Sequence, residues 1–419
     1  MTDPALDAAV AEAEALLEAG DAVAAAARVE AHEAAVETHE RLALLWAALL
    51  GAVGDARVLA RQLRRLSAAW PRHPVVALRC AAAATRWADP WPATEARDPL
   101  AALGADFVAR CIDGGGAVDR FVAPLHLALA RALARSGPRH DDKALAAFEV
   151  ALSADPEDAR GWADLARFHQ QRRRFVQGLG AAREALRHRP DDKPARWTAA
   201  VCATALADPG AVADWAALDH LAAGRDGGGR PRVEGLPAVE VVLWRTTPLH
   251  LDRGAPAADN AAQDDTPAAP ASAQVGTARD GASAQDDTPA GEALWVEPSS
   301  PCHGRIVSPS ALALPADYDD VILWDPRPLS FRVVGDAEVP RFGALAVLGR
   351  GPARTWRYHA ASALDAAAVE RGLPPGCRLY PFAGRVSGAA ALDGKLVAPR
   401  ALDRAALEAA LAPAGVTLA

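Results

Sequence analysis

The sequence predicts a mostly α-helical protein, in which a solenoid of paired helices is followed by a smaller α+β domain. Three observations lead to this fold class. Apolar residues recur at helical spacing through roughly the first half of the chain. A Gly-rich link from Arg225 to Pro231 then ends the helices. Short apolar runs with strand character follow the link. A chain of 419 residues is also longer than one core usually serves, so two domains are expected.

The helical half begins with short amphipathic segments in pairs. Helices are expected over residues 5–18, 22–35, 41–52, 56–69 and 74–86. The turn pair Gly20–Asp21 separates the first two helices, and Trp70–Pro71 follows the fourth. Alanine is greatly over-used, which favours helices that pack closely through small side chains.

The strongest repeat signal spans two helix pairs that end at Pro156 and Pro190. These two prolines, and likewise Ala151 and Ala185, are separated by about 34 residues. The first helix of the second pair carries Trp162, Leu165 and Ala166; the second helix of the first pair carries Ala144, Phe148 and Ala151. Helices containing Trp197 and Trp215 are expected to end the stack.

This pattern resembles the tetratricopeptide repeat, whose helix pair carries W-x2-L-G-x2-Y in its first helix and A-x3-F before a closing Pro. Trp162, Leu165 and Ala166 stand at the first three places, and His169 replaces the Tyr. In the preceding pair, Ala128 stands where Trp is usual. The resemblance covers about half the chain and is specific over two helix pairs.

The resemblance implies a scaffold that binds a protein or peptide in a concave groove lined by first helices. By this analogy the partner-binding positions are Arg160, Ala163, Arg167 and Gln170. Arg174 joins them because it continues a seven-residue spacing along one side of the helix. Since guanidinium pairs with carboxylate, an acidic partner is expected. The alternative is that these arginines only pair with Asp158 or Asp164 in solvent.

Charge and composition exclude several classes of partner. A formal net charge of -8 argues against nucleic acid. Five cysteines without CxxC spacing argue against a zinc site or a disulfide framework, and no metal or cofactor is expected. The acidic N-terminus and the lack of an apolar run of about 18 residues predict no membrane partner and a cytoplasmic location. The oligomeric state stays open.

The predicted organisation is a helical domain over 1–225, a link with the first strand over 226–251, a low-complexity insertion over 252–292, and the rest of the second domain over 293–419. Strands are expected at 239–244, 293–296, 304–307, 320–324, 331–334, 345–348, 355–358 and 378–382, and helices at 362–371 and 405–411. The insertion contains AQDDTPA twice, at 262–268 and 284–290, and its composition predicts disorder.

The alternative function is an enzyme in the second domain, with the repeats recruiting a protein substrate. Candidate catalytic residues are Cys302 and His303, with Asp325 as a partner from another strand. Neighbours in an extended segment point to opposite faces, so Cys302 and His303 are poorly placed as a dyad. A loop that satisfies its own backbone is the competing interpretation. The Asp317, Asp319 and Asp320 cluster similarly indicates a solvated turn more than a metal loop.

Overall fold

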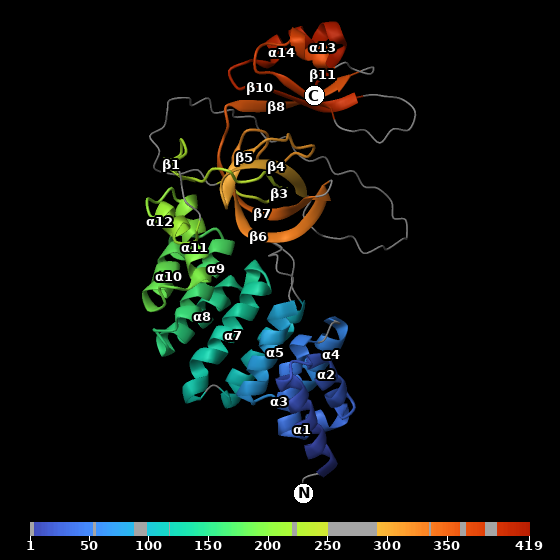
Figure 1. The fold of residues 1–419 in the computed structure, drawn as a ribbon, viewed down its shortest axis with the longest axis vertical. Helices are drawn as coiled ribbons and strands as arrows, with labels where there is room; N and C mark the ends of the chain where they lie inside the picture. The colour runs from blue at the N-terminus through green and yellow to red at the C-terminus, as the bar shows by residue number, and fades with distance from the viewer. Residues whose placement is uncertain are drawn as a thin grey trace, which may run out of the picture.

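A computed structural model describes residues 4–52, 56–87, 99–116, 118–219, 224–249, 291–334, 337–360, 366–381 and 392–419. The fold class predicted from the sequence is confirmed, because paired helices fill the N-terminal half and sheets with two further helices follow. Figure 1 shows a stack of helices, a barrel beside its last helices, and a smaller sheet beyond the barrel. The insertion predicted at 252–292 lies almost entirely outside the described residues.

Most helices of the stack pack against the next helix in the chain, and α3 packs against α2 and α5. Several begin at an Asp whose carboxylate accepts a hydrogen bond from the first turn, such as Asp21, Asp158 and Asp192. The helices are α1 (Pro4–Glu18), α2 (Ala22–Glu30), α3 (Glu40–Leu49), α4 (Ala56–Ala69), α5 (Pro74–Trp87), α6 (Pro99–Cys111), α7 (Val122–Arg135), α8 (Asp141–Ala154), α9 (Ala159–Gln171), α10 (Phe175–His188), α11 (Lys193–Ala205) and α12 (Ala211–Ala216).

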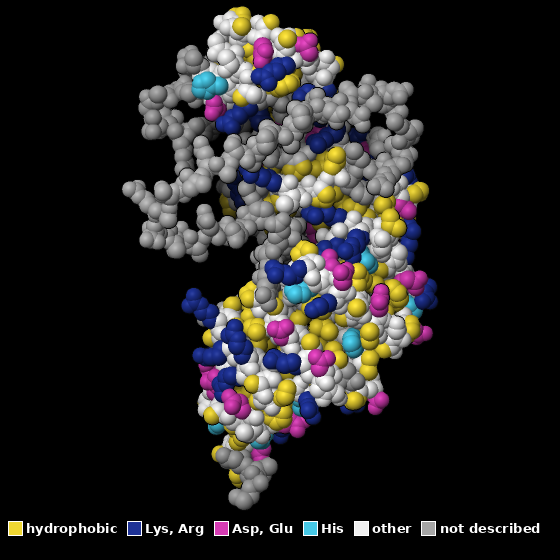
Figure 2. Space-filling view, turned by 180° about the vertical axis from the view of Figure 1, so that it is seen from behind, with side chains coloured by type: hydrophobic (Ala, Val, Ile, Leu, Met, Phe, Trp, Pro, Cys, Tyr) yellow, Lys and Arg dark blue, Asp and Glu magenta, His cyan; other side chains and the backbone are white. Residues whose placement is uncertain are grey.

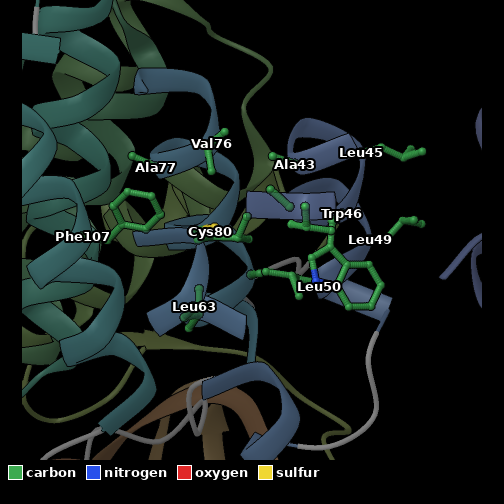
Figure 3. Packing of buried hydrophobic residues seen from close by; sticks show 14 of the residues in the cluster. Ala43, Leu45, Trp46, Leu49, Leu50, Leu63, Val76, Ala77, Cys80 and Phe107 are labelled. Carbon is green, nitrogen blue, oxygen red and sulfur yellow. The ribbon is translucent and has the colours of Figure 1, made fainter. Parts of the chain in front are cut away.

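The first helices enclose a continuous apolar core. Trp46 and Leu50 from the region of α3 pack with Leu63 of α4, Cys80 of α5 and Phe107 of α6, as Figure 3 shows. All five side chains are at most 2% exposed. Burying apolar surface of this kind is the main driving force that holds short helices together.

In the later helices, small residues lie where helices cross closely. Ala144, Ala151 and Ala185 are buried, while Ala146 on the same helix as Ala151 is exposed. A Cβ atom at Gly178 of α10 would lie 2.9 Å from the Cys202 Sγ of α11 and 3.3 Å from the Ala166 carbonyl oxygen of α9. Glycine therefore permits the close approach of three helices at this point.

The Gly-rich link forms a small hairpin in which β1 (Gly224–Arg225) pairs with β2 (Pro231–Arg232). Gly229 supplies the left-handed backbone of the turn, with φ of 77°. The Asp226 carboxylate accepts hydrogen bonds from the backbone amides of Gly228 and Arg230, at 2.9 Å and 2.8 Å.

The next five strands close into a barrel: β3 (Val239–Trp244), β4 (Gly291–Ser300), β5 (His303–Ile306), β6 (Val321–Val334) and β7 (Ala337–Gly349). Each strand pairs antiparallel with the next. Because their number is odd, the first and last run in the same direction, and β3 closes on β7 in parallel. The separate expectations at 320–324 and 331–334 are two ends of the single strand β6.

The barrel wall is apolar on both faces where it meets the helices. Ile322 and Trp324 point into the barrel core, whereas Leu323 between them joins a cluster with α9, α10 and α11. Leu345 and Ala346 of β7 belong to the same cluster. In addition, the Arg173 Nε donates a hydrogen bond of 2.6 Å to the Leu345 carbonyl oxygen. The barrel is therefore fixed to the last helices of the stack.

The remaining elements form a four-stranded antiparallel sheet in the order β11-β8-β10-β9, with two helices. They are β8 (Ala353–Ala360), α13 (Ala366–Gly372), β9 (Arg378–Pro381), β10 (Leu392–Pro399), α14 (Arg404–Leu411) and β11 (Val416–Leu418). Tyr358, Leu396 and Leu407 are buried in the core between the sheet and the helices.

The Asp-rich loop before β6 joins the barrel to this sheet. Asp320, which is 2% exposed, pairs with Arg350 at 2.7 Å and Arg400 at 3.5 Å. Asp317 pairs with Lys395 of β10 at 3.3 Å. The solvated turn expected from the sequence is wrong for Asp320, because basic side chains from the adjoining sheet cover it. These carboxylates are satisfied by cations of the protein itself.

Candidate functional site: a groove lined by α5, α7 and α9

The concave side of the helical stack contains a hollow of about 640 Å³. Its walls come from alternate helices α5, α7 and α9, with residues of the α8–α9 turn at one rim. Small and apolar side chains such as Ala81, Leu127 and Ala128 form its floor. We call this hollow the concave groove.

Charged side chains line the groove along α7, α9 and the turn between α8 and α9. They are Arg131, Arg135, Asp155, Asp158, Arg160, Asp164 and Arg167. Arg131 Nε donates a hydrogen bond of 2.6 Å to Asp164, so these two charges largely cancel. Burial raises the pKa of Asp164 even though Arg131 opposes this. Asp158 is engaged as the helix cap, accepting from the Arg160 amide at 3.0 Å.

Arg167 is the least compensated charge in the groove. It is half-buried, and within the described residues its guanidinium has neither a hydrogen bond nor an ion pair. Burial lowers the pKa of Arg167 to about 10, and repulsion from Arg327 and Arg135 acts in the same direction. Attraction by Asp325 and Asp164 only partly opposes these effects. Among the described residues, the protonated form of Arg167 therefore has no carboxylate paired directly with it.

Arg327 and Asp325 belong to β6 of the barrel, so the barrel contributes charge to one end of the groove. They form an ion pair with each other, and Arg327 Nε donates to Asp325 Oδ1 at 2.9 Å. Asp325 is thus paired directly with Arg327, and it acts on Arg167 only by attraction over a longer distance. Arg160 lies about two helical turns away along α9 and is exposed.

Other predicted groove positions lie elsewhere. Ala163 is half-buried and is not among the groove-lining residues, and Gln170 is only 3% exposed. Arg174 is separated from Arg160 and Arg167, because α9 ends at Gln171 and the chain turns at Arg173, where φ is 60°. The seven-residue spacing of the three arginines therefore continues past the end of α9, and the partner-binding role of Arg174 stays a prediction.

Arg174 instead lines a second hollow of about 770 Å³ between α8, α9 and α10. Trp162, Leu165 and His169 also contribute to its wall. His169 is 8% exposed, and its Nδ1 has no hydrogen-bond partner among the described residues. Burial lowers its pKa to about 4, with the charge of Arg174 as a smaller cause. His169 is therefore neutral near pH 7.

The candidate catalytic side chains in the barrel are buried. Cys302 and His303 are 0% exposed and Asp325 is 4% exposed. Burial raises the pKa of the Cys302 thiol to about 12, so the nucleophilic thiolate is negligible near pH 7. Among the described residues, no hydrogen bond or ion pair joins Cys302, His303 and Asp325 directly, because His303 pairs with Asp226 and Asp325 pairs with Arg327. Cys302 and His303 meet through Ser300 Oγ, which is 3.7 Å from the Cys302 Sγ and 2.6 Å from His303 Nδ1.

His303 does lie in a Ser–His–Asp arrangement that the sequence did not suggest. Ser300 Oγ is 2.6 Å from His303 Nδ1, and His303 Nε2 is 3.1 Å from Asp226 Oδ2. Burial lowers the pKa of His303 despite the bond to Asp226, which favours a neutral ring that donates to Asp226 and accepts from Ser300. Because Ser300 and His303 are both fully buried, the network anchors the β1–β2 hairpin to the barrel.

Arg131 and Arg135 were not singled out from the sequence, and Asp164, which was considered as a partner of the α9 arginines, pairs with Arg131 instead. Because α7 lacks the Trp that marks a first helix of the repeat, the repeat pattern did not identify it as a groove-lining helix. The four-residue spacing of Arg131 and Arg135 does place both side chains on one helical face, and this spacing was the available signal.

Among the described residues, no helix is long and apolar enough to cross a membrane. The same part of the chain contains no group of three or more His, Cys, Asp or Glu side chains placed to hold a metal ion.

Comparisons with known proteins assign no family. No protein-family model matches the chain, and neither does any curated protein sequence. Among solved structures, a point mutant of MamA is similar with a TM-score of 0.30 and 17% identity, over 43% of this chain and 94% of that chain. A likeness at this TM-score carries no argument about function.

Proposed function

We propose that this protein is a binding scaffold whose concave groove takes an acidic segment of a protein partner. The observation that carries the proposal is Arg167, a half-buried guanidinium that lines the groove and has no directly paired carboxylate among the described residues. A carboxylate from a partner would pair with the charged guanidinium of Arg167 and offset the repulsion from Arg327 and Arg135.

The shape of the groove fits an extended peptide better than a small molecule. Its walls run across three helices from α5 to α9, so it is a trough and not an enclosed cavity. The resemblance to tetratricopeptide repeats supports the same type of ligand, because first helices in that family line a peptide-binding surface. Arg160 is exposed on α9 and could pair with a second carboxylate, about 10 Å from Arg167 along the helix.

The surface charge outside the groove is mixed. Figure 2 shows Lys and Arg side chains on the helical half interspersed with Asp and Glu. Many of these charges are paired, such as Arg41 with Glu14 and Arg183 with Asp208. Selective binding of an acidic peptide therefore depends on the few uncompensated arginines of the groove and not on the overall net charge of -8.

The test is binding of a fluorescent hexaglutamate peptide to the full chain, with hexaglutamine as the neutral comparison. Hexaglutamate should bind and hexaglutamine should not. Changing Arg160→Gln together with Arg167→Gln should weaken binding about tenfold or more, since a hydrogen bond to a charged group contributes about 1.5–3 kcal/mol. High salt should weaken the binding of the parent protein as well.

The matched control is Arg187→Glu, which changes the net charge by the same amount. Arg187 is 65% exposed on α10, pairs with Glu184 and does not line the groove. This variant should bind hexaglutamate nearly as well as the parent does. Equal weakening by both variants would mean that peptide affinity follows net charge alone, and the groove assignment would be wrong. Because Arg160 is exposed, the single variant Arg160→Gln should fold like the parent. Weaker binding of hexaglutamate by this single variant would therefore not be due to misfolding.

A further inference from the structure

We propose that the chain's own acidic segment, around the duplicated sequence AQDDTPA, binds in the concave groove and competes there with an acidic partner. This inference rests on the function proposed above and names a regulator of the same groove. It is carried by three observations: the charge of the segment, the points at which it leaves and re-enters the barrel, and the length of chain between them.

The segment carries carboxylates that would pair with the arginines of the groove. Residues 250–290 contain seven Asp and two Arg, with neither Glu nor Lys. Both copies of AQDDTPA present two adjacent carboxylates, Asp264–Asp265 and Asp286–Asp287. Each copy also carries few apolar side chains, which suits a trough whose selectivity comes from charge.

The segment starts at the junction between the barrel and the helices. Leu249, the last described residue before it, bridges Val347 of β7, and the Val347 amide donates to the Pro248 carbonyl at 2.9 Å. Two residues from Val347 along β7, the Leu345 carbonyl accepts the hydrogen bond from Arg173. The chain therefore departs beside the part of β7 that packs against α9 and α10.

The segment also re-enters near the same end of the groove. Gly343 of β7 pairs with Asp325 of β6 on one side and with Val242 of β3 on the other. Two residues beyond Val242, Trp244 lies opposite Gly291, where β4 begins. Three interstrand steps of about 4.8 Å and two residues of about 3.3 Å place Gly291 within about 21 Å of Asp325, whose charge acts on Arg167.

The length of the segment is sufficient. Asp264 is separated from Leu249 by enough residues to extend about 45 Å, at roughly 3.3 Å per residue, which exceeds the distances above. A tethered ligand of this length has an effective concentration in the millimolar range. Even weak binding of the segment would therefore lower the apparent affinity of the groove for an external peptide.

The test compares the parent chain with a full-length variant in which Asp264, Asp265, Asp286 and Asp287 are all changed to Asn. Hexaglutamate should bind the variant about three- to tenfold more tightly, because the internal competitor is lost while the length of the segment is kept. A synthetic AQDDTPAAP peptide, which reproduces residues 262–270, should displace hexaglutamate from this variant, whereas AQNNTPAAP should not.

A second variant controls for the change in net charge. Exposed carboxylates outside the groove are neutralised in the same number, by Glu→Gln at Glu18, Glu30, Glu234 and Glu338. This control should bind hexaglutamate like the parent. Tightening in both variants, or in neither, would overturn the inference while leaving the groove function intact. Tightening that depends on protein concentration would assign the contact to two copies and overturn it too. No binding of hexaglutamate to any form would instead refute the proposed function itself.

Discussion

At the scale of single residues, burial decides which ionisable groups are available. His169 stands where the tetratricopeptide pattern has Tyr, and it is held neutral by burial and by Arg174. Arg167 is also shielded from water, but guanidinium keeps its proton at neutral pH even with its pKa lowered to about 10. The same desolvation thus leaves one uncharged lining residue in the second hollow and one under-compensated cation in the concave groove.

The buried His169 predicts a pH dependence of stability. Its pKa is about 4 in the folded chain and about 6.5 when unfolded. Between these values the unfolded state binds a proton that the folded state does not, so stability falls as the pH is lowered from 6.5 towards 4. The slope from one such group is at most about 1.4 kcal/mol per pH unit.

His169→Phe should therefore flatten the dependence of the melting temperature on pH between 7.5 and 5. Some dependence should remain, because burial also lowers the pKa of His303 and His126. The comparison is between slopes, so a constant offset of the variant at pH 7.5 does not affect it. An unchanged slope would show that folding does not lower the pKa of His169.

At the scale of elements, close helix packing depends on small side chains whose places the repeat pattern indicates. Ala151 of α8 is 3% exposed, while Ala146 on the same helix is exposed. Both are alanines in one helix, so their helix propensities are equal and only the packing differs.

Ala151→Leu should overpack the α8 environment and lower the free energy of unfolding by about 1–3 kcal/mol. Ala146→Leu should change it by less than about 0.5 kcal/mol, as is usual for surface substitutions. Denaturant unfolding of both variants measures the difference. Equal effects would contradict the helical faces described above.

Which elements could be predicted depended on local pattern. The helices α1, α4 and α5 begin and end within one residue of the expected ranges, and β3 was expected over its full length. The helix α6 and the strand β10 were not expected, and each contains a glycine that lowers its propensity. A Cβ at Gly104 would lie 3.0 Å from the Cβ of Ala84, and one at Gly394 would lie 2.5 Å from the Tyr358 ring. Tertiary packing requires these glycines, and a local pattern cannot reveal that.

The candidate site, like the elements, was predictable only where a local sequence pattern marked it. The spacing of Arg160 and Arg167 indicated a shared helical face, and both line the groove. The role of β6 at the end of the groove could not be foreseen, because Arg327 and Asp325 are distant in sequence from α9 and reach it only through closure of the barrel.

At the scale of the whole molecule, the barrel connects two parts. On one side Leu323 and Leu345 pack against the last helices. On the other, Asp317 and Asp320 pair with Lys395 and Arg400 next to the C-terminal sheet. Figure 1 shows this order from the helical stack through the barrel to the sheet. The groove therefore ends against a fixed wall, and the acidic segment leaves from that wall.

The most direct test of the central claim is to locate a bound acidic peptide. A hexaglutamate peptide with a terminal benzophenone group, photo-crosslinked to the full chain and analysed by mass spectrometry, should modify α5, α7 or α9 at residues that line the concave groove. Unlabelled hexaglutamate should suppress these crosslinks. Crosslinks confined to the outer surfaces of α8 and α10, or to the C-terminal sheet, would contradict the account.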